Sequence, residues 1–136
     1  MKQKLFVIGD IHGECAMLEK MLEFWDPQDQ QLLFIGDLID RGADPAECLA
    51  LVQKLVAEKD AICLKGNHEN MLLNFLSDPE TYVANYFING GMTTLETLLE
   101  EEIQNKSPKK MAQEIEKKHR DLIQMIEQLP LYFEWN

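Results

Sequence analysis

Residues 32–37, Leu32-Leu33-Phe34-Ile35-Gly36-Asp37, contain the pattern that decides the fold: a short apolar run that ends in glycine and a polar side chain. The same pattern occurs at residues 5–10, which end in Gly9-Asp10, and at residues 61–67, which end in Gly66-Asn67. Continuous rather than alternating apolar residues are typical of strands that are buried on both faces of a sheet. We therefore predict three strands, at residues 5–8, 32–35 and 61–64.

The segments between these runs have the periodicity of helices. The apolar residues of 14–25 predict one helix, and those of 44–56 predict a second. Asp44 suits the cap of the second helix and Pro45 its first position. Glu47 can close a capping box there. This alternation of strand and helix indicates an α/β fold with parallel strands, in which ligands bind beyond the carboxyl ends of the strands.

The second half of the sequence is less informative. We predict helices at residues 69–76, 93–102 and 107–128, and a turn at Asn89-Gly90-Gly91. His119 lies at the edge of the apolar face of the last helix, so we interpret it as a packing residue rather than a metal ligand. Because no repeat or linker divides the chain, residues 1–136 are predicted to form one domain.

Composition restricts the partners and the location of the protein. Of its 136 residues, 46% are hydrophobic and 27% are charged, as in soluble globular domains. The sequence has no signal peptide and no apolar run long enough to cross a bilayer, which predicts a cytoplasmic protein. The formal net charge of −11 disfavours nucleic acid and anionic membranes as partners. Small phosphorylated substrates are compatible with it if a metal creates a local positive site.

The three cysteines, Cys15, Cys48 and Cys63, are widely spaced and contain no CxxC pair. This argues against a disulfide framework or a zinc ribbon. All three fall in apolar or helical patterns, so we predict that they are small buried hydrophobic residues.

Three polar motifs stand at the predicted carboxyl ends of the strands. They are Gly9-Asp10-Ile11-His12-Gly13, Gly36-Asp37-Leu38-Ile39-Asp40-Arg41-Gly42 and Gly66-Asn67-His68-Glu69. Carboxylate, imidazole and amide ligands together suit Mn²⁺, Fe²⁺ or Zn²⁺ better than they suit a pure Mg²⁺ site. Asp37 follows the central strand and could bridge two metal ions about 3.5–4 Å apart. The sequence therefore predicts a two-metal site.

The motifs GDIHG, GDLIDRG and GNHE, in this order, resemble the three N-terminal motifs of the phosphoprotein phosphatases. These are the serine/threonine branch of the calcineurin-like metallophosphoesterases. The resemblance implies an α/β/β/α sandwich, of which this chain supplies roughly the first βαβαβ half plus a helical region. It also implies a metal-dependent phosphomonoester hydrolase that uses two divalent ions, with Mn²⁺ favoured over Fe²⁺ or Zn²⁺, and a metal-bound hydroxide.

The same resemblance assigns roles to individual residues. Asp10 and His12 would bind the first metal, Asp37 would bridge, and Asn67 would bind the second. Three further residues would be catalytic, and the substrate would be a phosphorylated protein or a small phosphoester. Arg41 would hold the phosphate oxygens with its planar fork. His68 would protonate the leaving oxygen, with Asp40 holding its imidazole.

Two alternative functions remain open. The similar diadenosine tetraphosphatases commonly lack an aspartate at the position of Asp40, so its presence favours phosphomonoesters without excluding dinucleotide hydrolysis. The family pattern also continues with two later metal histidines that this sequence lacks, and the chain ends in a strand-like segment at residues 133–136. We therefore expect a domain truncated at its C-terminus and inactive alone, or a catalytically weak protein that binds metal or a partner. The incomplete sheet would favour self-association.

Overall fold

A small parallel sheet lies at one end of the molecule. The computed structural model describes residues 2–135, and in this range the sheet has the strand order β1-β2-β3, with β1 at Lys4–Ile8, β2 at Gln30–Phe34 and β3 at Ile62–Cys63. Lys4 pairs with Gln30, and Leu33 pairs with Ile62. The predicted parallel arrangement is confirmed, although β3 is shorter than expected. The order places β2, and the loop that follows it, in the centre.

Helices α1 (Cys15–Leu22) and α2 (Pro45–Lys59) connect the strands. Helix α1 ends before the predicted residue 25, and the indole of Trp25 instead donates a hydrogen bond to the carbonyl of Gln30 at 3.0 Å. Asp44 occupies the cap position of α2, but its side chain makes no capping hydrogen bond. The predicted capping box is therefore wrong, although the start of the helix is right.

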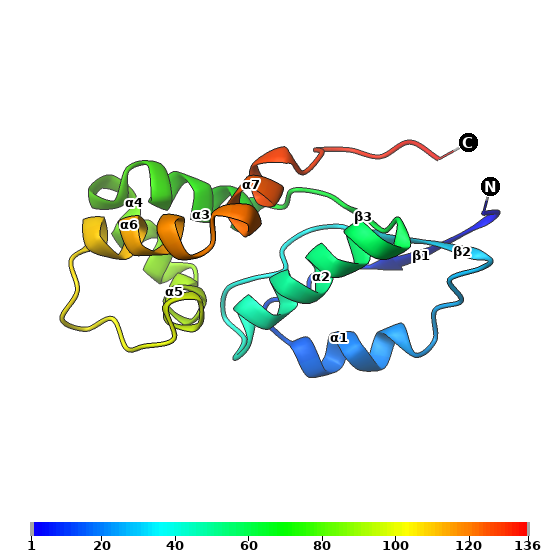
Figure 1. Ribbon diagram of the computed structural model, residues 1–136, viewed down its shortest axis with the longest axis horizontal. Helices are drawn as coiled ribbons and strands as arrows, with labels where there is room; N and C mark the ends of the chain where they lie inside the picture. Colours follow the sequence, from blue (N-terminus) through cyan, green and yellow to red (C-terminus); the bar gives the residue numbers. More distant parts are fainter. Residues whose placement is uncertain (1, 136) are drawn as a thin grey trace.

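A cluster of helices lies beside the sheet (Figure 1). It contains α3 (Asn67–Ser77), α4 (Pro79–Ile88), α5 (Gly91–Leu99), α6 (Pro108–Lys118) and α7 (Arg120–Gln128). Helix α4 has no counterpart in the sequence prediction. The single helix predicted at residues 107–128 is two helices, because the chain breaks at His119, whose φ of −125° and ψ of 39° are not helical.

One hydrophobic core joins the sheet to the helices. Fully buried side chains come from β2, α2, α3, α5, α6 and α7, and they include Phe34, Leu49, Leu72, Leu95, Ile115 and Ile126. Burying one such side chain contributes about 1.5–3 kcal/mol. The shared core therefore fixes the helices relative to the strand ends. Cys15, Cys48 and Cys63 are buried within it as free thiols, as predicted.

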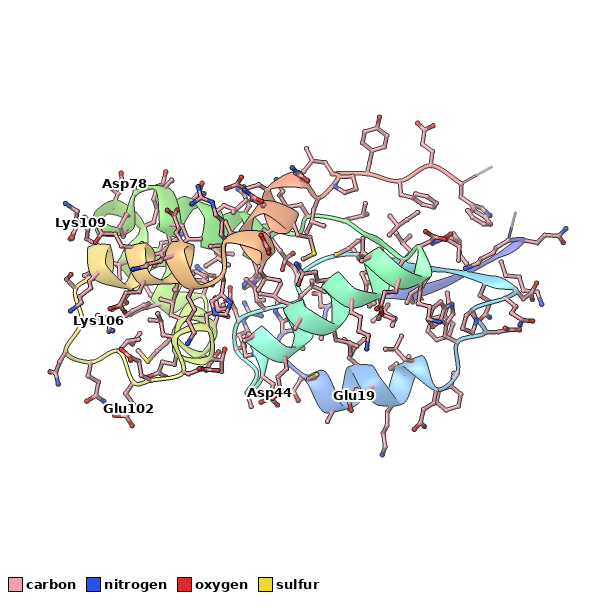
Figure 2. The ribbon with its side chains drawn as sticks, viewed as in Figure 1. Glu19, Asp44, Asp78, Glu102, Lys106 and Lys109 are labelled. Atoms are coloured by element: carbon pink, nitrogen blue, oxygen red, sulfur yellow. The ribbon has the colours of Figure 1, made fainter. Side chains whose placement is uncertain are left out.

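The outer surface of the helical cluster is charged. Figure 2 shows Asp78, Glu102, Lys106 and Lys109 at the end of the cluster farthest from the sheet. Lys106 pairs with Glu101 and, at 2.5 Å, with Glu114. These partners raise the pKa of Lys106. Side chains of both signs here form an ordinary solvated surface.

The last described residues lie outside the sheet. Residues 133–135 form no strand, so the strand-like interpretation is wrong for them, and Asn136 lies outside the described residues. The backbone nearby makes one contact with the sheet end, in which Lys65 N donates to the carbonyl of Pro130 at 2.8 Å. Within residues 2–135, none of the helices combines the length and apolarity needed to cross a bilayer.

Candidate metal and phosphate site

The three polar motifs converge in space, as predicted. The carbonyl of Asp37 accepts hydrogen bonds from the backbone N–H groups of Ile11 and His12, at 3.1 and 3.0 Å. Gly13 N donates in the same way to Leu38, at 2.8 Å. The loop after β1 is thus joined to the loop after β2 through backbone atoms. This places Asp10 and His12 beside Asp37.

Asp10, His12 and Asp37 form a cluster that can hold a metal ion. Each offers one ligand atom, and these atoms lie within 4.8 Å of one another. The Nδ1 atom of His12 is 2.9 Å from the carbonyl oxygen of Ile39. Because a carbonyl only accepts, Nδ1 must carry the proton, which leaves Nε2 with the lone pair that a metal requires. The donor set and the tautomer of His12 therefore fit a divalent cation.

Asn67 lies at the same edge of the sheet, as the first residue of α3, and its side chain is exposed. The next residue is tied to the cluster, because His68 N donates to Asp37 Oδ1 at 2.9 Å. Gly66 makes this close approach possible. A Cβ atom there would lie 2.5 Å from both the backbone nitrogen and Oδ1 of Asp37.

Asp40 and His68 form a buried pair beside this cluster. Asp40 Oδ2 lies 2.7 Å from His68 Nδ1, and the two residues are 0% and 6% exposed. The rings of His68 and His12 meet edge to face, with their centroids 4.6 Å apart. A carboxylate on Nδ1 fixes the orientation of the imidazole and favours a proton on that nitrogen. Only Nε2 is then left to act on another group.

Two residues that the sequence analysis did not identify complete the surroundings of Asp40. The hydroxyl of Tyr86 donates to Asp40 Oδ1 at 2.7 Å, and that of Thr94 donates to the same oxygen at 2.6 Å. Burial and the negative charge of Asp40 raise the pKa of Tyr86, so its hydroxyl keeps its proton. No sequence signal was available for these contacts, because Tyr86 and Thr94 lie 46 and 54 positions away from Asp40.

Arg41 is exposed at the surface of the same loop. Its backbone N–H donates to the carbonyl of Gly90 at 3.0 Å. Gly90 has a φ of +92°, and a Cβ atom there would lie 2.5 Å from Arg41 Cγ. The glycine is therefore required both by its left-handed conformation and by the approach of Arg41.

Glu69 is a further residue whose role was not predicted, although it completes the third motif. Its side chain is fully buried and accepts three backbone hydrogen bonds. Asp37 N and Gly66 N donate to Oε1 at 2.7 and 2.9 Å, and Leu38 N donates to Oε2 at 2.9 Å. Burial raises the pKa of Glu69, while these three donors favour its charged form. The carboxylate clamps the loops after β2 and β3 together.

Backbone strain is concentrated at the motif residues. Six non-glycine residues in the described part of the chain have positive φ angles, and four of them belong to the motifs: His12, Asp37, Asp40 and Arg41, at 43°, 53°, 72° and 75°. Such conformations are unfavourable for residues other than glycine and persist only when the surroundings enforce them. The backbone N–H groups of the loop of residues 36–42 donate to Glu69, Thr94 and Gly90, and these hydrogen bonds provide that enforcement.

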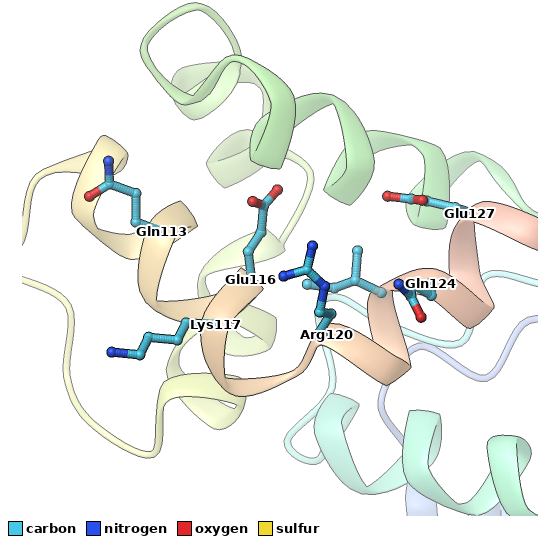
Figure 3. A pocket seen from close by; sticks show the side chains of 7 residues that line it. Gln113, Glu116, Lys117, Arg120, Gln124 and Glu127 are labelled. Atoms are coloured by element: carbon cyan, nitrogen blue, oxygen red, sulfur yellow. The ribbon is translucent and has the colours of Figure 1, made fainter.

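A surface groove elsewhere in the molecule contains none of the motif residues. It has a volume of about 400 Å³ and lies along α6 and α7. Figure 3 shows that its labelled side chains are polar and carry both signs of charge, with Arg120 between Glu116 and Glu127. His119 lies at the helix junction nearby, where its Nε2 is 2.6 Å from the carbonyl of Leu98. That contact agrees with the prediction of a packing histidine.

Three known proteins are similar to this chain over part of its length. It is 40% identical over 89 residues to serine/threonine-protein phosphatase 1 of Salmonella typhimurium, covering 64% of this chain and 38% of the relative. It is 37% identical over 82 residues to bis(5'-nucleosyl)-tetraphosphatase PrpE (asymmetrical) of Oceanobacillus iheyensis, covering 53% and 33%. A crystal structure of a candidate diadenosine tetraphosphatase has the same fold, with a TM-score of 0.58 at 22% identity, covering 93% of this chain and 42% of that one.

The family is established by a match over nearly the whole chain. The chain spans about two fifths or less of the length of these relatives. The family profile described as "Calcineurin-like phosphoesterase", in contrast, matches residues 3–132. With the parallel sheet and the clustered Asp10, His12 and Asp37 at its strand ends, this match shows that the chain belongs to the calcineurin-like phosphoesterase family.

Proposed function

We propose that this chain carries the catalytic face of a metal-dependent phosphomonoester hydrolase of the serine/threonine protein phosphatase type. One observation carries the proposal: a cluster of metal-ligating atoms within 4.8 Å adjoins a buried carboxylate–imidazole pair at 2.7 Å. The first group can bind a cation and the second can supply a proton. A metal-dependent phosphoester hydrolase can use both, the cation to activate water and the proton to assist the leaving group.

The metal ligands would be Asp10, His12 and Asp37 for one ion, with Asp37 bridging to a second ion that Asn67 also binds. Mixed oxygen and nitrogen donors suit Mn²⁺, Fe²⁺ and Zn²⁺ alike, and Mn²⁺ is the ion that we propose first. Divalent ions bound there would lower the pKa of water and attract the phosphate. The half-burial of His12 and Asp37 supports this arrangement, because it removes competing solvent from the ligand atoms.

Two side chains would act on the substrate itself, and a third would position one of them. Arg41 is exposed on the loop that carries Asp37 and would bind two phosphate oxygens with its planar fork. His68 would give a proton from Nε2 to the leaving oxygen. Asp40, on the opposite ring nitrogen, would hold the imidazole in place.

The charge of the chain and the state of its cysteines support a substrate class and a location for this proposal. An acidic chain with a local cationic site suits phosphorylated proteins or small phosphoesters and disfavours nucleic acid. A cytoplasmic location accords with three buried free thiols, which are typical of reducing compartments.

A diadenosine tetraphosphatase is the second candidate. The 37% identity to the Oceanobacillus enzyme favours it, whereas the Asp40–His68 pair favours phosphomonoesters. The two can be distinguished by assaying the intact gene product with a phosphopeptide and with diadenosine tetraphosphate, each with and without Mn²⁺. We expect faster Mn²⁺-dependent release of phosphate from the phosphopeptide. Faster cleavage of the dinucleotide would support the second candidate, and turnover of neither would indicate a metal- or partner-binding role.

A further inference from the structure

Helices α4 and α5 follow one another directly, joined by a turn at residues 89–90, and are called the α4–α5 pair here (Figure 1). This pair contributes none of the motif residues. Three of its residues, spaced four apart, nevertheless contact the loop of residues 36–42: Tyr86, Gly90 and Thr94. The contacts reach Asp40 and Arg41, which are the two residues of that loop with a proposed catalytic role.

The contacts with Asp40 fix both its side chain and its backbone. Tyr86 and Thr94 donate to Oδ1, so Oδ2 is left to face His68. The hydroxyl oxygen of Thr94 also accepts a hydrogen bond from Asp40 N at 2.9 Å. A buried carboxylate with only one partner would be costly, and one held on a single oxygen could rotate. With both oxygens engaged, the carboxylate has one orientation.

The contact with Arg41 fixes the next position of the loop. Arg41 N donates to Gly90 O, and the turn approaches so closely that a side chain at Gly90 would meet Arg41. Asp40 and Arg41 both have positive φ angles, so the loop needs outside support to keep this shape. The α4–α5 pair supplies that support at two consecutive residues.

We propose that Tyr86 and Thr94 are positioning residues, which hold the Asp40 carboxylate so that it orients His68 for proton donation to the leaving oxygen. This inference rests on the proposed phosphatase function. It assigns the positioning of the proton donor in part to the α4–α5 pair, far from the Asp40 motif in sequence. A purely stabilising role would instead affect all substrates equally.

The kinetic test uses Tyr86→Phe, Thr94→Val and the double variant in the intact gene product with Mn²⁺. Loss of a general acid affects poor leaving groups most, and general acids contribute about 10²–10⁴-fold. We expect kcat for an alkyl phosphate to fall at least about tenfold in the double variant. We expect KM, and kcat for 4-nitrophenyl phosphate, to change little. Thr94→Ser keeps the hydroxyl and should restore the alkyl phosphate rate.

Matched controls lie on the same two helices. Tyr82 is a half-buried tyrosine of α4, and Thr97 of α5 donates to the backbone carbonyl of Thr93 at 2.9 Å rather than to Asp40. Tyr82→Phe and Thr97→Val should leave the ratio of the two substrate rates unchanged. Equal losses for both substrates in the Thr94 and Tyr86 variants, or no loss, would overturn the proposal.

A second measurement separates this inference from the proposed function. If the wild-type protein hydrolyses neither substrate, the phosphatase function fails, and the geometry is then tested by ¹⁵N NMR of the histidine rings in metal-free protein. We expect His68 to carry its proton on Nδ1 in the wild type and in both control variants. The double variant should lose this preference. A His68 ring that is unchanged in the double variant would refute the positioning role.

Discussion

Glu69 Oε1 accepts a hydrogen bond of 2.7 Å from the backbone nitrogen of Asp37, 32 positions earlier in the chain. The same carboxylate accepts from Leu38 and Gly66, so one side chain joins the loops after two neighbouring strands. Its buried charge is therefore tolerated because it is matched by three donors. The position of Asp37, the residue proposed to bridge two metal ions, therefore depends on Glu69, which needs no contact with metal or substrate.

Glu69→Gln should destabilise the protein. An amide has only one oxygen, so at least one of the three backbone donors would lose its acceptor and face an NH₂ group. An unpaired buried donor costs about 1–3 kcal/mol. We expect the free energy of unfolding, measured by urea denaturation, to fall by at least this amount. Glu58→Gln, on the exposed face of α2, serves as a control and should stay within about 0.5 kcal/mol of wild type.

Asp37→Asn should remove metal binding while preserving the fold. Asparagine tolerates the positive φ of 53° at this position, and its oxygen can still accept from His68 N. It lacks the negative charge of a bridging ligand. We expect Mn²⁺ affinity, measured by calorimetry, to fall at least about tenfold. Even the loss of a residue that only supports a metal ligand typically lowers affinity by this factor. Asp60→Asn is matched in backbone conformation, with a φ of 56°, and should bind as wild type does.

His68→Asn should separate binding from proton transfer. Asparagine cannot donate a proton to the leaving oxygen, whereas the residues assigned to the metals are unaltered. We expect unchanged Mn²⁺ affinity and a loss of about 10²–10⁴-fold in turnover of an alkyl phosphate, with a smaller loss for 4-nitrophenyl phosphate. Unchanged alkyl phosphate turnover would contradict the assignment. His119→Asn is the histidine control and should alter both substrates alike.

Gly66→Ala should displace Asp37. The added Cβ would lie 2.5 Å from two atoms of Asp37, one of them in the backbone, so the loop must move. Overpacking of this kind costs about 1–3 kcal/mol. We expect lower thermal stability and weaker Mn²⁺ binding together. Gly9→Ala is the matched control, because a Cβ there has nothing within 4 Å and should leave both quantities close to wild type.

The buried thiols should be unreactive in the folded protein. Burial raises the pKa of Cys48 and of Cys63 from 9.0 to about 12, so little thiolate is present at pH 8. We expect slow alkylation by iodoacetamide, followed by mass spectrometry, and rapid alkylation in urea. Rapid labelling of the native protein at either residue would be inconsistent with this burial.

The same thiols predict a pH dependence of stability. Between about pH 9 and 12 the unfolded chain releases thiol protons that the folded chain retains, because the folded pKa is the higher one. This contribution to stability is complete below pH 9. The free energy of unfolding should therefore decrease as the pH rises through that window, and Cys63→Ala should reduce the slope.

The sheet and the convergence of its polar loops could be predicted from local sequence. The three strands lie within continuous apolar runs, and each run is followed by glycine and a side chain that can bind a metal. Because ligands bind at the carboxyl ends of parallel strands, these side chains are expected at one edge of the sheet. Asp10, His12 and Asp37 were identified in this way, and the structure brings their ligand atoms together.

The helical half could not be predicted as well, because long-range contacts decide it. Tyr82, Val83 and Tyr86 have little helix preference, yet α4 forms around a fully buried Tyr86. The apolar pattern of residues 107–128 is compatible with one helix, but the contact of His119 with Leu98 accompanies a break there. The partners of Asp40 could likewise not be predicted, because a hydrogen bond between residues distant in sequence leaves no local sequence pattern.

The left-handed backbone at His12, Asp37, Asp40 and Arg41 limits what these motifs indicate when they occur in another sequence. A peptide of residues 36–42 in water would populate other conformations, because nothing would offset the cost of positive φ. The residue types of the motif thus supply the functional groups, whereas the surrounding domain imposes the backbone geometry. Transplanting GDLIDRG into an unrelated loop would transfer the side chains without the site.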